Sequence, residues 1–361
     1  MTALQYTDHR ANPASWARDL GISREAIDIY LASEVIDLHI DTFIWWRIFR
    51  YDFMRRHGHG LLGARFYSQV DLPRIREAQV TGGIWSITTN PLRREKDRPE
   101  VFAKNVRDLR SIFEGARDDV AIARNVTEYE RARRDGKHAA FIGIQGGNAL
   151  DRDEKSIDVI PDDLVIKTTV VHLSTSKLGV TSAPKPFGDD AREGLSKDGL
   201  DFVERLDAKK IFVDLAHIDR KGFFDALSVH DKNVPAIVSH TGVTGVYEHW
   251  RNVDDEQIRA IANTGGVVGV MYQVSFLGDP FLGVTVDHVA AHLDHIVKVA
   301  GEDVPALGSD WDGAIQPPRD MPTCLELPRL VEALLRRGWK AERIQKMLGK
   351  NFLRALKGLR G

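Results

Sequence analysis

The sequence predicts an α/β fold, a (β/α)8 barrel of the TIM type, and three observations support this prediction. Eight short runs rich in Val, Ile and aromatic residues alternate with stretches that carry apolar residues at helical spacing. Most of these runs are apolar almost throughout, which is typical of parallel strands covered on both faces. Several runs end in a His, an Asp or a Gln, as expected where barrel strands present functional side chains at their carboxyl ends.

The predicted elements follow one another along the 361 residues of the chain. The barrel strands are expected at residues 35–41, 82–89, 139–145, 164–173, 209–216, 234–239, 265–272 and 304–309. Helices are expected between them, at residues 99–118, 197–210, 219–230, 254–266 and 286–301. Residues 1–34 are expected to form a helical preface, with Ser23 as the N-cap of a helix, and residues 35–361 the barrel. Residues 327–359 are predicted to form two amphipathic helices separated at Gly338.

The segment from Thr42 to about Ser68 is too long for a simple turn between a strand and a helix. It mixes several aromatic residues with arginines. Two interpretations remain open. The segment could close over a substrate, because long insertions in compact domains often form lids or binding loops. It could also form a dimer contact, because aromatic residues and Arg are enriched at interfaces.

Composition excludes several classes of protein. The net charge of −2 and the absence of a basic stripe give no support to a nucleic-acid partner. The single cysteine, Cys324, rules out an intrachain disulfide and a thiolate-rich metal site. No apolar stretch is long enough to span a bilayer, and the first residues lack the apolar core of a secretory signal. We therefore expect a cytoplasmic protein without a membrane partner.

Imidazole and carboxylate side chains recur at the ends of the predicted strands. His39 and Asp41 are two residues apart on the first strand, so they share one face. His217 and His240 follow the fifth and sixth strands, and Asp310 follows the eighth. Each motif alone also fits a structural pair, but their joint occurrence in barrel order predicts a centre for a divalent metal such as zinc. A carboxylate at the position of Asp310 could transfer protons there.

Three other histidines share a predicted helix. His288, His292 and His295 are spaced i, i+4 and i+7. This spacing is compatible with a metal site, but a helix on the outside of a barrel favours a mixed surface face instead.

From about Val35 to the C-terminus the chain resembles the membrane (renal-type) dipeptidases, peptidase family M19 of the amidohydrolase superfamily. The motifs that carry the resemblance include DLHID, IGIQGGNAL, VVHLS, VDLAHI, IVSHTG, HWRNVDDEQIRAIANTGGVVGVMY and LGSDWDG. The resemblance implies a (β/α)8 barrel of the metal-dependent hydrolase type, a two-zinc centre and hydrolysis of dipeptides. It also implies a small substrate with a free carboxylate and a homodimeric assembly.

The resemblance assigns metal ligands residue by residue. His39 and Asp41 match the ligands of one zinc, and His217 and His240 match ligands of the other. Asp310 matches an aspartate that relays protons near the metal.

Three further positions correspond to residues that contact the substrate. His172 matches a histidine that contacts the substrate carbonyl or the tetrahedral intermediate, and Arg251 matches an arginine that holds a substrate carboxylate. Tyr272 falls near a position of the substrate pocket. Without the resemblance, Arg251 would be interpreted as part of a surface salt bridge and Tyr272 as a core aromatic residue.

Gln145 departs from the family pattern, which places a glutamate that bridges both metals at this position. An amide offers one good donor atom and no charge, so two Zn²⁺ ions would lack a compensating carboxylate here. We expect a weakened second metal site, a single zinc, or a replacement ligand such as a carboxylated lysine. Lys167 on the fourth strand is the conceivable replacement, although a lysine on the barrel exterior is the favoured interpretation.

Three functional hypotheses follow. The first is a metal-dependent hydrolase acting on a dipeptide or a related small amide. The second is a single-metal amidohydrolase acting on a lactone, an N-acyl amino acid or another substrate that is not a dipeptide. The third is a non-catalytic binder of a small carboxylate. Gln145 motivates the second and the third.

Overall fold

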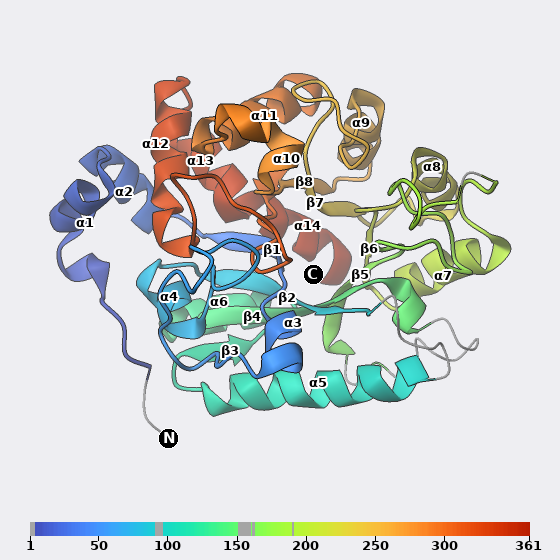
Figure 1. Ribbon diagram of the computed structural model, residues 1–361, viewed down its shortest axis with the longest axis horizontal. Helices are drawn as coiled ribbons and strands as arrows, with labels where there is room; N and C mark the ends of the chain where they lie inside the picture. Colours follow the sequence, from blue (N-terminus) through green and yellow to red (C-terminus); the bar gives the residue numbers. More distant parts are fainter. Residues whose placement is uncertain (1–3, 91–96, 151–159, 161–162, 190) are drawn as a thin grey trace.

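The computed structural model describes residues 4–90, 97–150, 160, 163–189 and 191–361 of the chain. Parallel strands form a closed barrel that is flanked by helices (Figure 1). The barrel strands are β1 (Ile36–Ile40), β2 (Gly82–Thr88), β4 (His138–Gln145), β5 (Val165–Thr169), β6 (Phe212–Asp214), β7 (Ile237–Thr241), β8 (Val267–Val270) and β9 (Pro305–Leu307). Each lies within or beside one of the runs expected from the sequence, so the predicted fold class is confirmed.

The barrel closes between the first and the last strand. β1 pairs with β2 on one side and with β9 on the other, where Asp37 lies opposite Leu307. β2 pairs with β4 without interruption from Gly82–Ala139 to Thr88–Gln145. Every strand is buried along its length apart from the end of β3. This agrees with the apolar runs in the sequence, which predicted strands covered on both faces.

A short strand, β3 (Val120–Ile122), was not expected from the sequence. It pairs with the beginning of β4, opposite residues 138–140, whereas β5 pairs with β4 further along, from Ile142 onward. β3 is therefore an addition beside the ring of barrel strands. Its three residues come soon after a helix and are too few to show a strand pattern.

Helices connect the strands and cover the barrel. They are α1 (Pro13–Leu20), α2 (Arg24–Leu31), α3 (Phe43–Phe49), α4 (Leu72–Glu77), α5 (Arg98–Gly115), α6 (Val126–Arg134), α7 (Lys197–Ala208), α8 (Arg220–Val229), α9 (Asp255–Asn263), α10 (Val274–Leu277), α11 (Val286–Ala300), α12 (Pro328–Arg336), α13 (Ala341–Gln345) and α14 (Asn351–Arg360). The five helices predicted between strands appear as α5, α7, α8, α9 and α11. The predicted break at Gly338 is also present, because this glycine has φ +81° just after α12.

The N-terminal helices pack against the C-terminal part of the chain. Figure 1 shows α2 beside α12, with α1 on the outer side of α2. The Ser23 hydroxyl accepts a hydrogen bond from Ala26 N, which confirms it as the N-cap of α2. The same hydroxyl donates to Glu332 of α12 over 2.6 Å. The cap of α2 thus also ties the predicted preface to the barrel.

The long segment after β1 has two parts. It begins with α3, and beyond this helix Tyr51 and Phe53 are buried. Leu61 then lies 96% exposed, and Leu62 and Phe66 are also exposed. The aromatic content of the segment therefore belongs partly to the core, and the expected homodimer stays a prediction.

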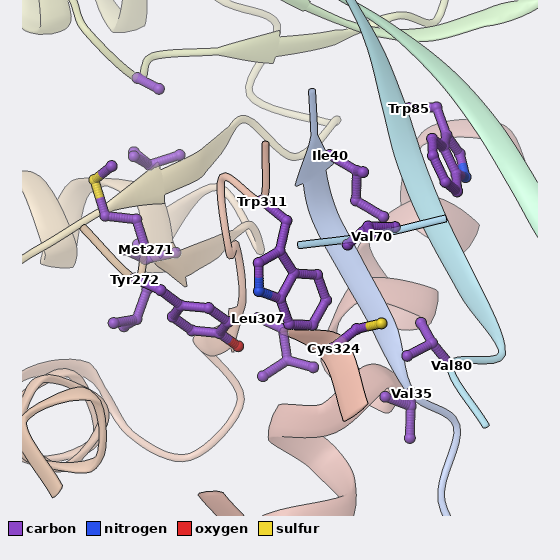
Figure 2. Packing of buried hydrophobic residues seen from close by; sticks show 14 of the residues in the cluster. Val35, Ile40, Val70, Val80, Trp85, Met271, Tyr272, Leu307, Trp311 and Cys324 are labelled. Carbon is purple, nitrogen blue, oxygen red and sulfur yellow. The ribbon is translucent and has the colours of Figure 1, made fainter. Parts of the chain in front are cut away.

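The core contains an unexpected histidine and an aromatic cluster. His292 is buried, with Nδ1 accepting from Val243 N and Nε2 contacting Leu277 O, so the surface face predicted for this part of α11 is wrong at His292. Figure 2 shows Tyr272 and Trp311 packed toward one another in the core, with ring centroids 5.5 Å apart.

Among the described residues no helix is both long enough and apolar enough to cross a membrane.

Candidate active site

The predicted site residues gather at the carboxyl ends of the barrel strands. His39 and His240 lie within β1 and β7, and Gln145 is the last residue of β4. Asp41, His172, His217 and Asp310 follow β1, β5, β6 and β9 within three residues. Because these strands are parallel and form one barrel, their ends meet at one mouth. The topology thus brings together residues that are far apart in the sequence.

Two imidazoles and an amide converge on one point. The Nε2 atoms of His217 and His240 are 2.8 Å apart. The Gln145 Nε2 atom lies 3.2 Å from the first and 3.3 Å from the second. Gln145 Oε1 is buried without a hydrogen-bond partner. Since the two ends of an amide have the same shape, a 180° rotation would turn this oxygen toward the imidazoles.

His39 faces two carboxylates beside this group. Its Nε2 atom lies 3.4 Å from Asp41 Oδ1 and 3.8 Å from Asp310 Oδ1. The Thr88 hydroxyl donates to Asp41 Oδ1 over 2.6 Å and so fixes that carboxylate. The His39 and His240 rings lie 3.9 Å apart, and one donor atom each of His39, His240 and Asp310 fall within 4.8 Å of one another.

Burial governs the protonation of these groups. It lowers the pKa of His217 and of His240 well below the ordinary histidine value, so both imidazoles are neutral. It raises the pKa of Asp310 well above the usual carboxyl range, and the nearby Asp41 carboxylate acts in the same direction. A divalent cation among these groups would favour the charged form of Asp310, because it reverses the local balance of charge.

Gly313 makes room for the Asp310 carboxyl. A Cβ atom on this glycine would lie 2.2 Å from Asp310 Oδ1, so no other residue fits without displacing the carboxyl. The backbone N–H of Gly313 also donates to Asp310 O. Gly313, the second glycine of the GSDWDG motif, is therefore required at this position for steric reasons.

Arg251 and His172 border the same space. Arg251 is only 4% exposed and donates from Nη2 to His240 O over 2.8 Å, while its Nε atom has no hydrogen-bond partner. Burial lowers the pKa of Arg251 to about 10, and it remains a cation at neutral pH. Burial likewise lowers the pKa of His172 to about 3, and its ring packs edge-on against His217. The surface salt bridge considered for Arg251 is not formed with any described carboxylate.

Tyr272 does not share this space. It is buried beneath the site, its hydroxyl has no hydrogen-bond partner, and the neighbouring Met271 lines the cavity instead. The position of Tyr272 thus gives no support to the predicted contact with substrate and agrees with a core aromatic residue. The chain has left β8 at this point, and Met271 and Tyr272 point in different directions.

Lys167 lies inside the barrel, so its favoured assignment to the exterior was wrong. It is completely buried and forms an ion pair with Asp214, Nζ to Oδ2, over 3.0 Å. Its Nζ atom also lies 2.7 Å from His39 Nδ1. The Lys167 ammonium and burial act in opposite directions on Asp214, and the net effect lowers the pKa of this carboxyl to about 2. An ammonium held in an ion pair has no lone pair for carbon dioxide, which speaks against a carboxylated lysine.

A cavity of about 510 Å³ opens over the site. Its polar lining includes Asp41, Gln145, His172, His217, Arg251 and Asp310. Its apolar lining includes Ile44, Ile48, Leu173, Trp250, Met271, Phe276 and Ile315. Most of the apolar residues were not expected from the sequence, because they lie in connecting segments whose course no periodicity reveals. Only the length of the segment after the first strand hinted that it would border the mouth.

The donor set suits a divalent metal ion. Imidazole nitrogen and carboxylate or amide oxygen are zinc ligands, and the Nε2 atoms of His217 and His240 converge on a common point. The unpartnered atom Gln145 Oε1 is buried beside them. Buried polar atoms without partners are rare in folded proteins and call for a ligand. The geometry of this group therefore fits a resident metal.

Comparison with known proteins identifies the family. The family model of the membrane dipeptidases (peptidase family M19) matches residues 23–360. The chain belongs to this family. A relative in this comparison, an uncharacterized protein in the pqqA 5' region of Klebsiella pneumoniae, is 27% identical over 267 residues, which are 73% of this chain and 97% of that protein. Membrane dipeptidase family members are metal-dependent, which agrees with the cluster of histidines and aspartate described above.

Solved structures share the barrel. A dipeptidase of family M19 is 25% identical with a TM-score of 0.78, and the match covers 91% of this chain and 98% of that one. A metallopeptidase from Rhodobacter sphaeroides, solved with a phosphinate mimic of the dipeptide L-Ala-D-Ala, is 24% identical with a TM-score of 0.80, covering 91% and 99%. A probable dipeptidase from Pseudomonas aeruginosa is 18% identical with a TM-score of 0.82, covering 95% and 99%. Family and fold together indicate a hydrolase.

Proposed function

We propose that this membrane dipeptidase family member hydrolyses a dipeptide or a related small amide that carries a free carboxylate. The observation that carries the proposal is the placement of Arg251. This buried cation lines the same cavity as the imidazoles and Asp310, and its Nε atom lacks a partner. A buried charge without a counter-ion is costly, and a substrate carboxylate would remove that cost. The dipeptide mimic bound by the Rhodobacter relative is consistent with this substrate class.

The protein groups around the cavity have complementary roles in amide hydrolysis. A zinc ion held by the histidines would supply Lewis acidity, which polarises a carbonyl and lowers the pKa of a water molecule. Asp310 accepts the proton of the attacking water and passes it to the leaving nitrogen as the carbon–nitrogen bond breaks. His172 is neutral and can donate one N–H hydrogen bond to the carbonyl oxygen as negative charge develops there. Arg251 fixes the free carboxylate.

Substitution of Asp310 tests this mechanism. We expect Asp310→Asn to lower kcat on a dipeptide panel by at least about 100-fold, because an amide cannot carry the proton. Metal content should remain that of the wild type. Asp279→Asn, which changes an exposed aspartate, is the matched control. Full turnover in Asp310→Asn would contradict the proposed role, and no turnover of any dipeptide by the zinc-loaded wild type would contradict the proposed function.

A second substrate class has support from the cavity itself. Ile48, Trp250 and Phe276 give the cavity an apolar wall, and Gln145 contributes no charge. An N-acyl amino acid combines an apolar acyl group with the carboxylate that Arg251 would hold. Clear turnover of N-acyl amino acids without turnover of dipeptides would favour this substrate over the first.

A further inference from the structure

The imidazoles of the candidate metal centre differ in the hydrogen-bond partner of the ring nitrogen that faces away from the centre. A histidine that binds a metal through one ring nitrogen needs a lone pair on that atom. The opposite nitrogen then carries the proton and normally donates it to a hydrogen-bond acceptor. The partner of the far nitrogen therefore decides whether a given imidazole is ready to bind a cation.

His240 has a suitable partner. Its Nδ1 atom lies 2.8 Å from the Ser239 hydroxyl, and that hydroxyl donates its own proton to Asp214 Oδ2 over 2.6 Å. With its proton engaged, the Ser239 oxygen accepts from Nδ1–H, which leaves a lone pair on Nε2. This Nε2 atom is the one that faces His217. The Nδ1 atom of His217 has no partner that would impose the opposite arrangement.

His39 has the opposite kind of partner. Its Nδ1 atom lies 2.7 Å from Lys167 Nζ, and an ammonium has donors but no acceptor. The Ser86 hydroxyl lies further from the same atom, at 3.3 Å, and can donate to it as well. With the ammonium as the nearest partner, the neutral ring accepts at Nδ1 and carries its proton on Nε2. That N–H faces Asp41 Oδ1 at 3.4 Å and Asp310 Oδ1 at 3.8 Å. In this arrangement His39 offers no lone pair to a cation.

The barrel is built to hold Lys167 in this place. Besides His39 and Asp214, Ser239 Oγ lies 3.1 Å and Thr169 Oγ1 lies 3.3 Å from its nitrogen. The three N–H groups of the ammonium are thus shared among four acceptors, of which His39 Nδ1 is the nearest. Gly143 on the neighbouring strand leaves space for the lysine, because a Cβ atom there would lie 2.9 Å from Lys167 Cε. Such a set of contacts fixes the ammonium below His39.

The charges around His39 also disfavour a metal ion at this residue, as the hydrogen bonds do. Gln145 contributes no negative charge where a carboxylate would bridge two ions, and Lys167 adds a buried positive charge beside His39. A second divalent cation at His39 and Asp41 would meet only the Asp41 and Asp310 carboxylates, and the Lys167 ammonium would oppose it at a largely buried position.

We propose that this centre holds a single metal ion, bound by His217 and His240 with the Gln145 side chain, and that Lys167 keeps His39 out of coordination. His39 then acts as a positioning residue, whose Nε2–H orients the carboxylates of Asp41 and Asp310. The inference rests on the proposed function only in taking a divalent metal as the resident cofactor. The number and place of the ion do not depend on the substrate.

Metal content per chain tests the proposal directly. Each variant is equilibrated with zinc, separated from free metal by gel filtration and measured by elemental analysis. We expect one zinc in the wild type, one in His39→Ala, and less than a tenth of one in His240→Ala. His59→Ala, which removes an exposed loop histidine, is the matched control and should retain one. Two ions or none in the wild type, or loss of metal in His39→Ala, would overturn the proposal.

A second set of variants tests the part played by Lys167. Gln145→Glu alone should stay near one zinc, because the ammonium is still in place. Gln145→Glu combined with Lys167→Met and Asp214→Asn should rise toward two, with circular dichroism confirming the fold. Two ions in Gln145→Glu alone, or one in the folded triple variant, would overturn the role of Lys167. Cobalt substitution gives an independent readout, since the visible spectrum should be the same in the wild type and His39→Ala and absent in His240→Ala.

Turnover separates this inference from the proposed function. One ion without hydrolysis of any substrate would support the single-metal centre and reject the hydrolase. Two ions with hydrolysis would support the hydrolase and reject the single-metal centre.

Discussion

Two residues of the active site adopt a left-handed backbone conformation, which residues other than glycine seldom adopt. His217 has φ 69° and Asp310 has φ 60°. The left-handed region costs of order 1 kcal/mol or more for such residues. Hydrogen bonds from Ser182 N and the Thr181 hydroxyl to His217 O, and from Asp310 N to His39 O, hold these conformations. The resulting sharp turns direct both side chains into the mouth immediately after their strands end.

Arg251 should matter only for substrates with a free carboxylate. We expect Arg251→Met to raise KM for such substrates by about 30-fold or more, since a charge-assisted hydrogen bond contributes about 2 kcal/mol. The same substrates with an amidated C-terminus should show little difference between variant and wild type. Arg259→Met, which changes an exposed arginine of α9, is the control for loss of positive charge. An equal loss of activity on both kinds of substrate, measured by steady-state kinetics, would argue against carboxylate binding.

The sequence predicted the residues at strand ends better than the direction of side chains within strands. His39, Asp41, Gln145, His217 and Asp310 all come to the mouth because a parallel barrel places every carboxyl end on the same side. The direction of a strand side chain also depends on irregularities in pairing. The register between β4 and β5 shifts between Ile142 and Gly143, and the inward position of Lys167 on β5 could not be derived from alternation alone.

At the scale of elements, α3 lies between the cavity and the core. Ile44 and Ile48 border the cavity, whereas Phe43 packs into the core. The helix is thus part of the cavity wall and is anchored from below. Because α3 presents apolar side chains to the cavity, we expect the site to favour substrates that carry an apolar group.

Removal of this apolar wall should change substrate preference. We expect Ile48→Ala and Trp250→Ala to raise KM for substrates with a large apolar group by about 5- to 30-fold, corresponding to about 1–2 kcal/mol of lost burial. Substrates with glycine at that position should be unaffected. Val246→Ala removes an exposed apolar side chain that does not line the cavity and serves as the control. Equal effects on large and small substrates would show that the wall does not contact the variable group.

Long helices with clear periodicity were predictable, and short or irregular pieces were not. α5, α7, α8, α9 and α11 follow the expected stretches closely because each buries one apolar stripe against the barrel. The π-helical segment Lys346–Lys350 between α13 and α14 carries no signal in the local pattern. Its conformation is set by packing, since Gly349 lies so close to Glu34 O that a Cβ would be 2.4 Å from it.

At the scale of the whole molecule, two buried histidines make stability depend on pH. His138 accepts from Trp85 Nε1 and contacts Val80 O with its other nitrogen, and His292 is likewise engaged at both nitrogens. Neither ring has room for a second proton. Burial accordingly lowers the pKa of each from 6.5 to about 4.

We expect the free energy of unfolding to fall as the pH drops from about 6.5 to about 4. In this window the unfolded chain binds protons on His138 and His292, whereas the folded chain does not, so acid favours unfolding. Each histidine contributes on the order of 3 kcal/mol across the full window. Urea unfolding at several pH values measures this dependence. His292→Gln should show a shallower slope than the wild type, and identical slopes would contradict the assignment.

The seam between β1 and β9 has a consequence for the synthesis of the protein. His39 is made early and Asp310 late, yet the two lie side by side because the last strand closes the barrel against the first. A nascent chain on the ribosome thus exposes its β1 edge until the sequence through β9 has emerged. Products of interrupted translation that stop before β9 would lack Asp310, and we expect them to be inactive even if their earlier strands pair correctly.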